Sequence, residues 1–292
     1  MIALIRRNRY LLARRLSQLG LLGLFLAGPL GLTLGNGKLW LVKGTLASSM
    51  TLGVLPLTDP LILLQTLLAG HWPELTALTG AAIVVGFYLL VGGRFYCAWV
   101  CPINMLTDGA GWLHRRLGWK TRMALPRQTR FWVLGAVLAL SVLTGTAAWE
   151  AINPITMLHR GLVFGTLLSG GLALSLCAAV FLLDLALGAR SWCGHLCPVG
   201  AFYGLIGKVG LIKVKAGKRQ ACDNCLDCYR VCPEPHVISP ALRGAARGIG
   251  PVVASPDCTN CGRCIDVCSK DVFQFATRFN SSTTPEKGES AL

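Results

Sequence analysis

Two runs of cysteines with identical spacing constrain the fold of this chain more than any other feature of its sequence. The runs are Cys222-x2-Cys225-x2-Cys228-x3-Cys232 and Cys258-x2-Cys261-x2-Cys264-x3-Cys268. Three thiolates on one tight loop and a fourth a few residues later are typical of ligands to a [4Fe–4S] cluster. The alternative is zinc, but a zinc site usually requires two Cx2–4C pairs for each ion. The x2-x2-x3 spacing, which occurs twice, therefore favours an iron–sulfur cluster. The sequence therefore predicts that both runs fold as loops around bound clusters.

The repeated spacing is similar to that of bacterial ferredoxins with two clusters, in which the fourth cysteine of each run completes the cluster of the other run. On this pattern the predicted ligands of the first cluster are Cys222, Cys225, Cys228 and Cys268. The predicted ligands of the second cluster are Cys258, Cys261, Cys264 and Cys232. We therefore expect a small α+β domain of the bacterial-ferredoxin type over residues 213–279, followed by a disordered tail over residues 280–292.

Four apolar stretches lie before the cysteine runs, at residues 16–35, 75–93, 131–149 and 161–187. The second stretch contains no charged residue and would be about 28 Å long as a helix, close to the thickness of the hydrocarbon core of a bilayer. The chain is 53% hydrophobic and only 14% charged, whereas about a quarter of the residues of a soluble domain are charged. The sequence therefore predicts an all-α membrane domain over residues 1–212 with four transmembrane helices.

Basic residues are unevenly distributed between the segments outside these stretches. Five lysines and arginines precede the first stretch, seven lie in residues 94–130 and thirteen follow from Arg190 onward, but residues 36–74 hold two and residues 150–160 hold one. The positive-inside rule therefore predicts a multi-pass protein of the bacterial inner membrane with both termini in the cytoplasm. Because this alternation accounts for most of the net charge of +15, we expect no nucleic-acid partner.

The apolar part of the chain contains a tandem repeat of two-helix units. The repeated pairs are Cys97-x3-Cys101-Pro102 with Cys193-x3-Cys197-Pro198, and Asp59-Pro60 with Asn153-Pro154. Each unit is predicted to consist of an outgoing span, an outer Asx-Pro loop, a returning span and a Cys-x3-Cys-Pro motif at the cytoplasmic edge. Two such units in the same orientation form a parallel repeat with a pseudo-twofold axis along the membrane normal.

The four cysteines of the Cys-x3-Cys-Pro motifs would converge at the cytoplasmic interface if the two units pack about this axis. On a helix, thiols four residues apart share one face. The four thiols could then hold a further cluster or metal ion, form redox-active disulfides, or serve only as small packing residues. The candidate catalytic residues are these four cysteines and the carboxylate of the first Asx-Pro turn, namely Cys97, Cys101, Cys193, Cys197 and Asp59.

Together, the four apolar stretches, both Cys-x3-Cys-Pro motifs and both cysteine runs resemble the NapH family, the ferredoxin-type membrane proteins of periplasmic nitrate reductase systems. The resemblance covers nearly the whole chain. It implies an inner-membrane component of a quinol dehydrogenase, which is an electron-transfer subunit rather than a stand-alone enzyme. The partners that it implies are a NapG-like periplasmic Fe–S protein and, in some systems, a NapC-like multihaem cytochrome. Electrons would then pass from quinol toward nitrate reductase, and Asp59 would be suited to accept a proton released by quinol oxidation.

The same membrane module is also similar to that of the NosR regulators of nitrous oxide reduction and of CcoG-type oxidase assembly proteins. This similarity leaves an alternative from another functional class. In the alternative, the chain is an accessory or maturation protein that supplies electrons while a metalloenzyme is assembled. It would use the same clusters but would need no quinol site.

Overall fold

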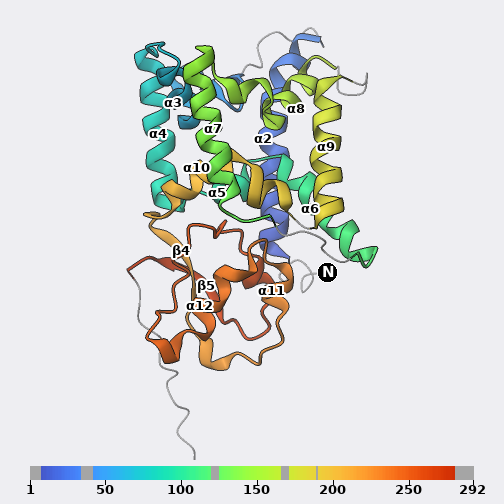
Figure 1. Ribbon diagram of the computed structural model, residues 1–292, viewed down its shortest axis with the longest axis vertical. Helices are drawn as coiled ribbons and strands as arrows, with labels where there is room; N and C mark the ends of the chain where they lie inside the picture. The colour runs from blue at the N-terminus through green and yellow to red at the C-terminus, as the bar shows by residue number, and fades with distance from the viewer. Residues whose placement is uncertain (1–7, 34–41, 120–124, 166–170, 189, 280–292) are drawn as a thin grey trace, which may run out of the picture.

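The computed structural model describes residues 8–33, 42–119, 125–165, 171–188 and 190–279. They form a helical part and a smaller part, stacked along the long axis of the molecule (Figure 1). Four long helices stand roughly parallel in the helical part: α2 (Arg9–Thr33), α4 (Leu75–Val91), α7 (Thr129–Thr144) and α9 (Leu172–Leu187). The shorter helices of this part are α3 (Pro60–Leu68), α5 (Phe95–Trp99), α6 (Ile103–Arg116), α8 (Pro154–Val163) and α10 (Pro198–Gly207), with single turns η1 (Ala148–Ala151) and η2 (Trp192–Leu196).

The long helices overlap the four predicted membrane spans, but three of them are shorter than predicted. α4 has 17 residues, and α7 and α9 have 16 residues each. α4 and α7 end where Gly92 and Gly145 take positive φ angles of 96° and 63°, which glycine adopts without a steric penalty. No helix in the described stretches has both the length and the apolar character needed to cross a membrane. The prediction of four transmembrane helices therefore finds no support in these helices.

The two Asx-Pro pairs of the predicted repeat have the same local structure. The Asp59 carboxylate accepts a hydrogen bond from the Leu61 amide at 2.9 Å, at the start of α3. The Asn153 side chain accepts one from the Ile155 amide at 3.1 Å, at the start of α8. In both cases proline is the first helical residue, where its fixed φ favours the helix and its missing N–H is not needed. Each unit of the repeat therefore contains a short capped helix.

The segment that was predicted as the first outer loop contains a three-stranded antiparallel sheet, so the helical part is not all-α. Its strands are β1 (Val42–Gly44), β2 (Ser48–Thr51) and β3 (Leu55–Thr58), paired in that order. The β1–β2 turn depends on Gly44, because a Cβ there would lie 2.3 Å from the Ser48 carbonyl oxygen. β3 packs against α4, and Asp59 directly follows β3 and is partly buried at the start of α3.

The lower part is a small α+β domain, as predicted. Strands β4 (Ile212–Ala216) and β5 (Phe273–Thr277) pair antiparallel, with Val214 opposite Phe275. Between them lie the short helices α11 (Asp227–Val231), α12 (Ile238–Arg243) and α13 (Arg263–Val267), with single turns η3 (Arg219–Ala221), η4 (Pro235–Val237) and η5 (Ala245–Arg247). Its core includes Val214, Val237, Ile265 and Phe273. The two strands close a domain whose long connection holds both cysteine runs.

Candidate functional site

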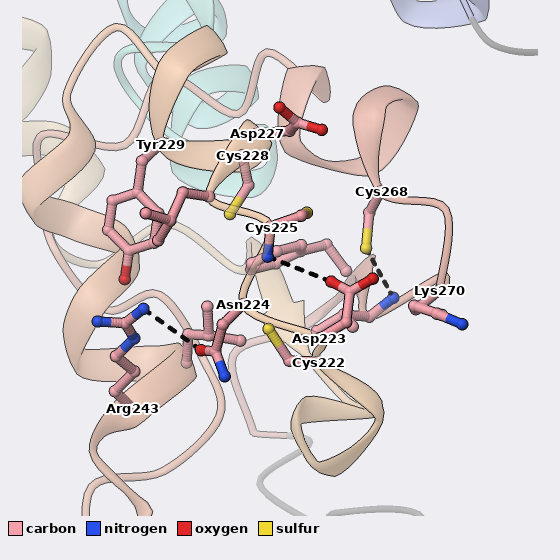
Figure 2. A pocket seen from close by; sticks show the side chains of 14 residues that line it. Cys222, Asp223, Asn224, Cys225, Asp227, Cys228, Tyr229, Arg243, Cys268 and Lys270 are labelled. Carbon is pink, nitrogen blue, oxygen red and sulfur yellow. Dashed lines mark hydrogen bonds between the residues drawn. The ribbon is translucent and has the colours of Figure 1, made fainter.

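The first group of thiols comes from both cysteine runs. Cys222, Cys225, Cys228 and Cys268 line one pocket (Figure 2). Cys222 and Cys225 lie on the loop that leads into α11 and Cys228 lies in its first turn, whereas Cys268 directly follows α13. The Cys268 Sγ also accepts a hydrogen bond from the Val272 amide at 3.5 Å. The fourth cysteine of the second run therefore lines the same pocket as the first three cysteines of the first run.

The second group of thiols combines three cysteines of the second run with the fourth cysteine of the first run. Its pocket is lined by Cys258, Cys261 and Cys264 of the second run and by Cys232 of the first. The two pockets are similar in size. Each offers four thiols, a donor set that suits an iron–sulfur cluster. Among the described residues, no group of three or more His, Cys, Asp or Glu side chains is placed to hold a metal ion. That iron is bound at these sulfurs stays a prediction.

The two cysteine loops share an unusual backbone conformation. Asn224 and Asn260, two residues after the first cysteine of each run, have φ angles of 58° and 48°. Leu226 and Gly262, four residues after it, have φ angles of 64° and 72°. Asparagine and glycine tolerate the left-handed region well, whereas leucine is strained there. Because strain of this kind persists where the surrounding structure requires it, both loops are held in the turn that brings three thiols together.

The surroundings of the two pockets differ. The first pocket is at the surface, where Cys225 is exposed and Arg243 and Lys270 line its rim. The second pocket faces the helical part. Burial raises the pKa of Cys258 to about 11 and that of Cys228 to about 11. For Cys261, the effect of burial is outweighed by the charges of Arg263 and Arg14, which lower the pKa of its thiol.

Asn260 joins the second cysteine loop to the helical part. Its side-chain amide donates to the Val91 carbonyl at 2.9 Å and to the Ile212 carbonyl at 2.8 Å. The backbone carbonyl of Asn260 accepts a hydrogen bond from the Trp99 indole N–H at 3.1 Å. Trp99 lies between the two cysteines of the first Cys-x3-Cys-Pro motif. The second pocket therefore adjoins that motif, whereas the first lies on the far side.

The four cysteines of the Cys-x3-Cys-Pro motifs are brought together. Cys101 is buried in the core of the helical part, and Cys97 and Cys197 pack against the same core. Cys193 interacts electrostatically with the other three. Burial raises the pKa of all four thiols, that of Cys197 to about 12. All thirteen cysteines are free thiols, so convergence is observed but a redox-active disulfide is not.

A buried ion network that the sequence analysis missed connects these motifs to the cysteine loops. Arg94, three residues before Cys97 of the first motif, donates to the Glu234 carboxylate at 3.2 Å and to the Asp257 carbonyl at 2.9 Å. Arg130 pairs with the Asp257 carboxylate. Glu234 and Asp257 stand beside Cys232 and Cys258 in the sequence. One signal was available, because Arg94 and Arg190 occupy equivalent positions in the repeat.

Asp59 lies beside a cluster of tyrosines. The Tyr203 hydroxyl donates to the Asp59 carboxylate at 3.3 Å, and the Tyr203 ring stacks on Tyr96 with centroids 4.9 Å apart. Burial, with a smaller effect of the Glu150 charge, raises the pKa of Asp59 to about 6. Asp59 therefore lies close to Tyr96, the residue that precedes Cys97. Its predicted position on the outer side of a membrane stays a prediction.

Two family models match the chain. A 4Fe-4S binding domain matches residues 74–120 and 170–219, which contain the Cys-x3-Cys-Pro motifs. A 4Fe-4S dicluster domain matches residues 221–272, which contain both cysteine runs. No solved structure is similar to the chain.

The chain is similar to curated proteins over nearly its whole length. The methylamine utilization ferredoxin-type protein MauN of Methylorubrum extorquens is 50% identical, covering 95% of this chain and 92% of that protein. The ferredoxin-type protein NapH of Escherichia coli is 47% identical, covering 94% of this chain and 92% of that protein. NapH of Haemophilus influenzae is 46% identical with the same coverage.

Proposed function

Because the chain belongs to the family of NapH and MauN ferredoxin-type proteins, we propose that it is the electron-transfer component of a membrane quinol dehydrogenase. Within its system, electrons would pass from quinol toward a periplasmic nitrate reductase. A NapG-like Fe–S protein and a NapC-like multihaem cytochrome would be its partners. The observation that carries this proposal is the grouping of eight thiols into two four-thiol pockets, one of which adjoins the helical part through Trp99 and Asn260.

In this proposal each pocket holds one [4Fe–4S] cluster through the four cysteines that line it. When bound, the two clusters supply one-electron redox centres. Residues of the chain fix the position of the second cysteine loop relative to the helical part. Asn260 holds the second cysteine loop against Val91 and Ile212, and Arg94 holds Glu234 and the Asp257 carbonyl next to the same loop. This arrangement keeps the second pocket at a constant position beside the Cys-x3-Cys-Pro motifs.

Asp59 is the proposed proton acceptor for quinol oxidation. A carboxylate with a pKa of about 6 is mostly ionised at pH 7 and can be protonated without a large penalty, as a general base requires. Tyr203 orients this carboxylate by donating to one of its oxygens. The four convergent thiols near Tyr96 are a proposed further redox or metal centre on the way to the second pocket.

We propose that the helical part is embedded in the inner membrane with both termini in the cytoplasm. Large apolar side chains are exposed on its long helices, among them Leu19, Phe87, Leu90, Trp132, Leu143 and Leu182. Such side chains are favourable in contact with lipid and unfavourable in contact with water when they form continuous patches. Alkaline extraction of membranes and reporter fusions at both termini test this. A protein that alkali releases from the membrane would contradict the proposal.

The central experiment is quinol-dependent reduction of the clusters. The protein is purified anaerobically, analysed for iron and sulfide, and reconstituted into liposomes that contain quinone. We expect EPR signals of reduced clusters after addition of a quinol-generating system, and we expect Asp59→Asn to slow their appearance. Material with full clusters that are reduced by dithionite but not by quinol would refute the dehydrogenase function.

A second candidate function is electron supply for the assembly of a metalloenzyme. MauN proteins are named for methylamine utilization rather than for nitrate respiration, so a role outside nitrate respiration is compatible with the family. Gene deletion separates the two functions. Loss of an assembly factor leaves the target enzyme without its metal or cofactor, whereas loss of an electron relay leaves a complete enzyme that receives no electrons.

A further inference from the structure

Four arginines gather where α2 and α6 meet the second cysteine loop. Three of them share one carboxylate: Arg15 and Arg263 pair with Asp108 at 2.6 and 2.5 Å, and Arg190 also pairs with it. Arg14 does not join them. Its side chain is 1% exposed, yet its terminal nitrogens Nη1 and Nη2 have no hydrogen-bond partner among the described residues. Only its Nε is bonded, to the Tyr10 carbonyl of its own helix.

Arg14 is a buried cation at neutral pH. Burial and the neighbouring Arg263 charge lower its pKa to about 10, which still leaves it protonated. The carboxylates that interact with these four arginines are Asp108, Asp184 and Asp266. The group therefore has more positive than negative charges. Because a buried charge without hydrogen bonds is unfavourable, the free donors of Arg14 indicate that an acceptor belongs beside them.

The position of Arg14 identifies that acceptor. Tyr10 and Arg14 lie one turn apart on the same face of α2. The Tyr10 ring presses on Gly262, where a Cβ would lie 2.6 Å from the tyrosine Cγ. The Asp266 carboxylate accepts from the Tyr10 and Leu11 amides at 3.0 and 3.2 Å, so the start of α2 is fastened to α13. On this face, Arg14 interacts electrostatically with Cys261.

We propose that Arg14 donates hydrogen bonds to the cluster held by Cys232, Cys258, Cys261 and Cys264, which we call the inner cluster. The outer cluster is the one held by Cys222, Cys225, Cys228 and Cys268. Arg14 would give the inner cluster a higher reduction potential than the outer cluster. This inference rests on the proposed ligand set. A cluster with four thiolates is negatively charged and gains one more negative charge on reduction, so a nearby cation stabilises the reduced form more than the oxidised form.

The surroundings of the two pockets decide which cluster is easier to reduce. Burial alone disfavours the more highly charged reduced form, so it would make the inner cluster the harder one to reduce. The basic residues at the outer pocket, Arg243 and Lys270, lie at its solvent-facing rim, where water screens their charge. Arg263 also lines the inner pocket, but its charge is paired with Asp108. Arg14, whose terminal nitrogens have no partner in the described part of the chain, therefore reverses the order that burial would impose. An electron delivered to either cluster then settles on the inner one, beside the helical part.

A redox titration followed by EPR tests this in the full-length protein, purified anaerobically and analysed for iron. In Arg14→Gln, we expect the inner cluster to move to a more negative potential while the outer one stays. At a fixed potential its ratio of reduced to oxidised form should fall about tenfold, which corresponds to about 59 mV for one electron. Cys261→Ser identifies the inner signal by altering it. Arg9→Gln is the matched control, because Arg9 lies on the same helix and contacts Asp266 at 3.8 Å but is 54% exposed.

The outcomes distinguish this inference from the proposed function. Wild-type protein without iron–sulfur clusters would refute the ligand set, and the inference with it. Fully loaded Arg14→Gln with both potentials unchanged would overturn the inference alone. If that variant fails to fold, wild type with ¹⁵N-labelled arginine answers the question. Pulsed EPR should then detect an arginine nitrogen coupled to the inner reduced cluster, and absence of that coupling would overturn the inference.

Discussion

Single charged residues hold the two parts of this molecule together. Arg94 is 2% exposed and contacts Glu234 and Asp257, which lie next to different cysteine runs. Burial by itself would lower the pKa of Arg94, but the two carboxylate charges raise it. An arginine in this position satisfies several acceptors at once, because its planar fork offers five donors. Lysine could not replace these contacts.

Removal of the Arg94 guanidinium should destabilise the protein strongly. Arg94→Met leaves Glu234 with a weaker partner and the Asp257 carbonyl without a donor, and breaking a buried ion pair from one side costs about 3–5 kcal/mol. We expect a value near the lower end, because Arg127 and Arg130 still contact the two carboxylates. Thermal unfolding measures the effect. Arg127→Met is the control: its side chain is 45% exposed, and the change should stay below about 1 kcal/mol.

Asp59 makes a pH-dependent contribution to stability, and the repeat itself supplies the test. Its pKa is raised from 3.8 to about 6 in the folded protein, so the folded state binds its proton more tightly than the unfolded state. Its charge is therefore neutralised below about pH 4, and its destabilising effect grows as the pH rises through 6. Asp59→Asn removes that effect and keeps the helix cap, as Asn153 does in the second unit.

We expect Asp59→Asn to leave stability almost unchanged at pH 4 and to raise it by about 1–3 kcal/mol at pH 7.5. Thermal unfolding at the two pH values measures this difference. An equal effect at both values would show that the carboxylate has an ordinary pKa, and Asp59 would then lose its main qualification as a proton acceptor.

At the scale of elements, helix ends decide which segments meet. α4 ends at Val91, and the two glycines that follow allow α10 to approach the backbone closely. A Cβ on Gly93 would lie 1.8 Å from the Tyr203 carbonyl oxygen. The predicted apolar span 75–93 ends at Gly92 and Gly93, and these two glycines form the contact point between the two units of the repeat. Composition alone does not reveal which helix will pack there.

Substitution of Gly93 should therefore separate α4 from α10. Gly93→Ala forces the two backbones apart, and overpacking of this kind typically costs about 1–3 kcal/mol or more. The matched control is Gly86→Ala within α4, where a Cβ meets no atom within 4 Å. Alanine there should be neutral or stabilise the helix by up to about 1 kcal/mol. Thermal unfolding of both variants checks the difference, and equal values would show that the close approach is absent.

At the scale of the whole molecule, the arrangement is asymmetric although both large parts contain repeats. The two cysteine loops have the same backbone conformation, but they differ in their contacts. Asn260 makes two hydrogen bonds with the helical part, to the Val91 carbonyl and from the Trp99 indole, and a third to Ile212 of β4. Its counterpart Asn224 is at the surface, where its side-chain oxygen accepts a bond from Arg243 at 3.3 Å. Equivalent positions in a repeat thus have different roles, and this difference can be measured.

Asn260→Asp should weaken the contact between the two parts of the molecule. Aspartate keeps the tolerance for positive φ but loses both amide donors, which leaves the Val91 and Ile212 carbonyls without this partner at about 1–3 kcal/mol each. We expect faster proteolysis between the two parts and slower quinol-dependent cluster reduction at unchanged iron content. Asn224→Asp is the control and should change stability by no more than about 0.5 kcal/mol. Identical behaviour of the two variants would contradict the asymmetry.

The sequence by itself determined the features that depend on neighbours along the chain. The cysteine spacing predicted the two sets of four thiols, and the Asx-Pro repeat marked both capped helices, because loop turns and helix caps involve residues only two to four positions apart. The β1–β3 sheet was missed, because its short strands have no clear alternation of apolar and polar residues and are held by packing on α4. The lengths of α4, α7 and α9 were overestimated, because an apolar composition does not show where a glycine ends a helix.

Only the tertiary structure decided which pocket faces the helices and which charges surround it. Arg94 and Glu234 are 140 positions apart, and Trp99 and Asn260 are 161 positions apart. No spacing in the sequence relates such residues, because their contact results from the packing of whole elements. The same holds for Arg14: in the sequence it is one of five arginines near the start of the chain, and burial beside Cys261 makes it distinct.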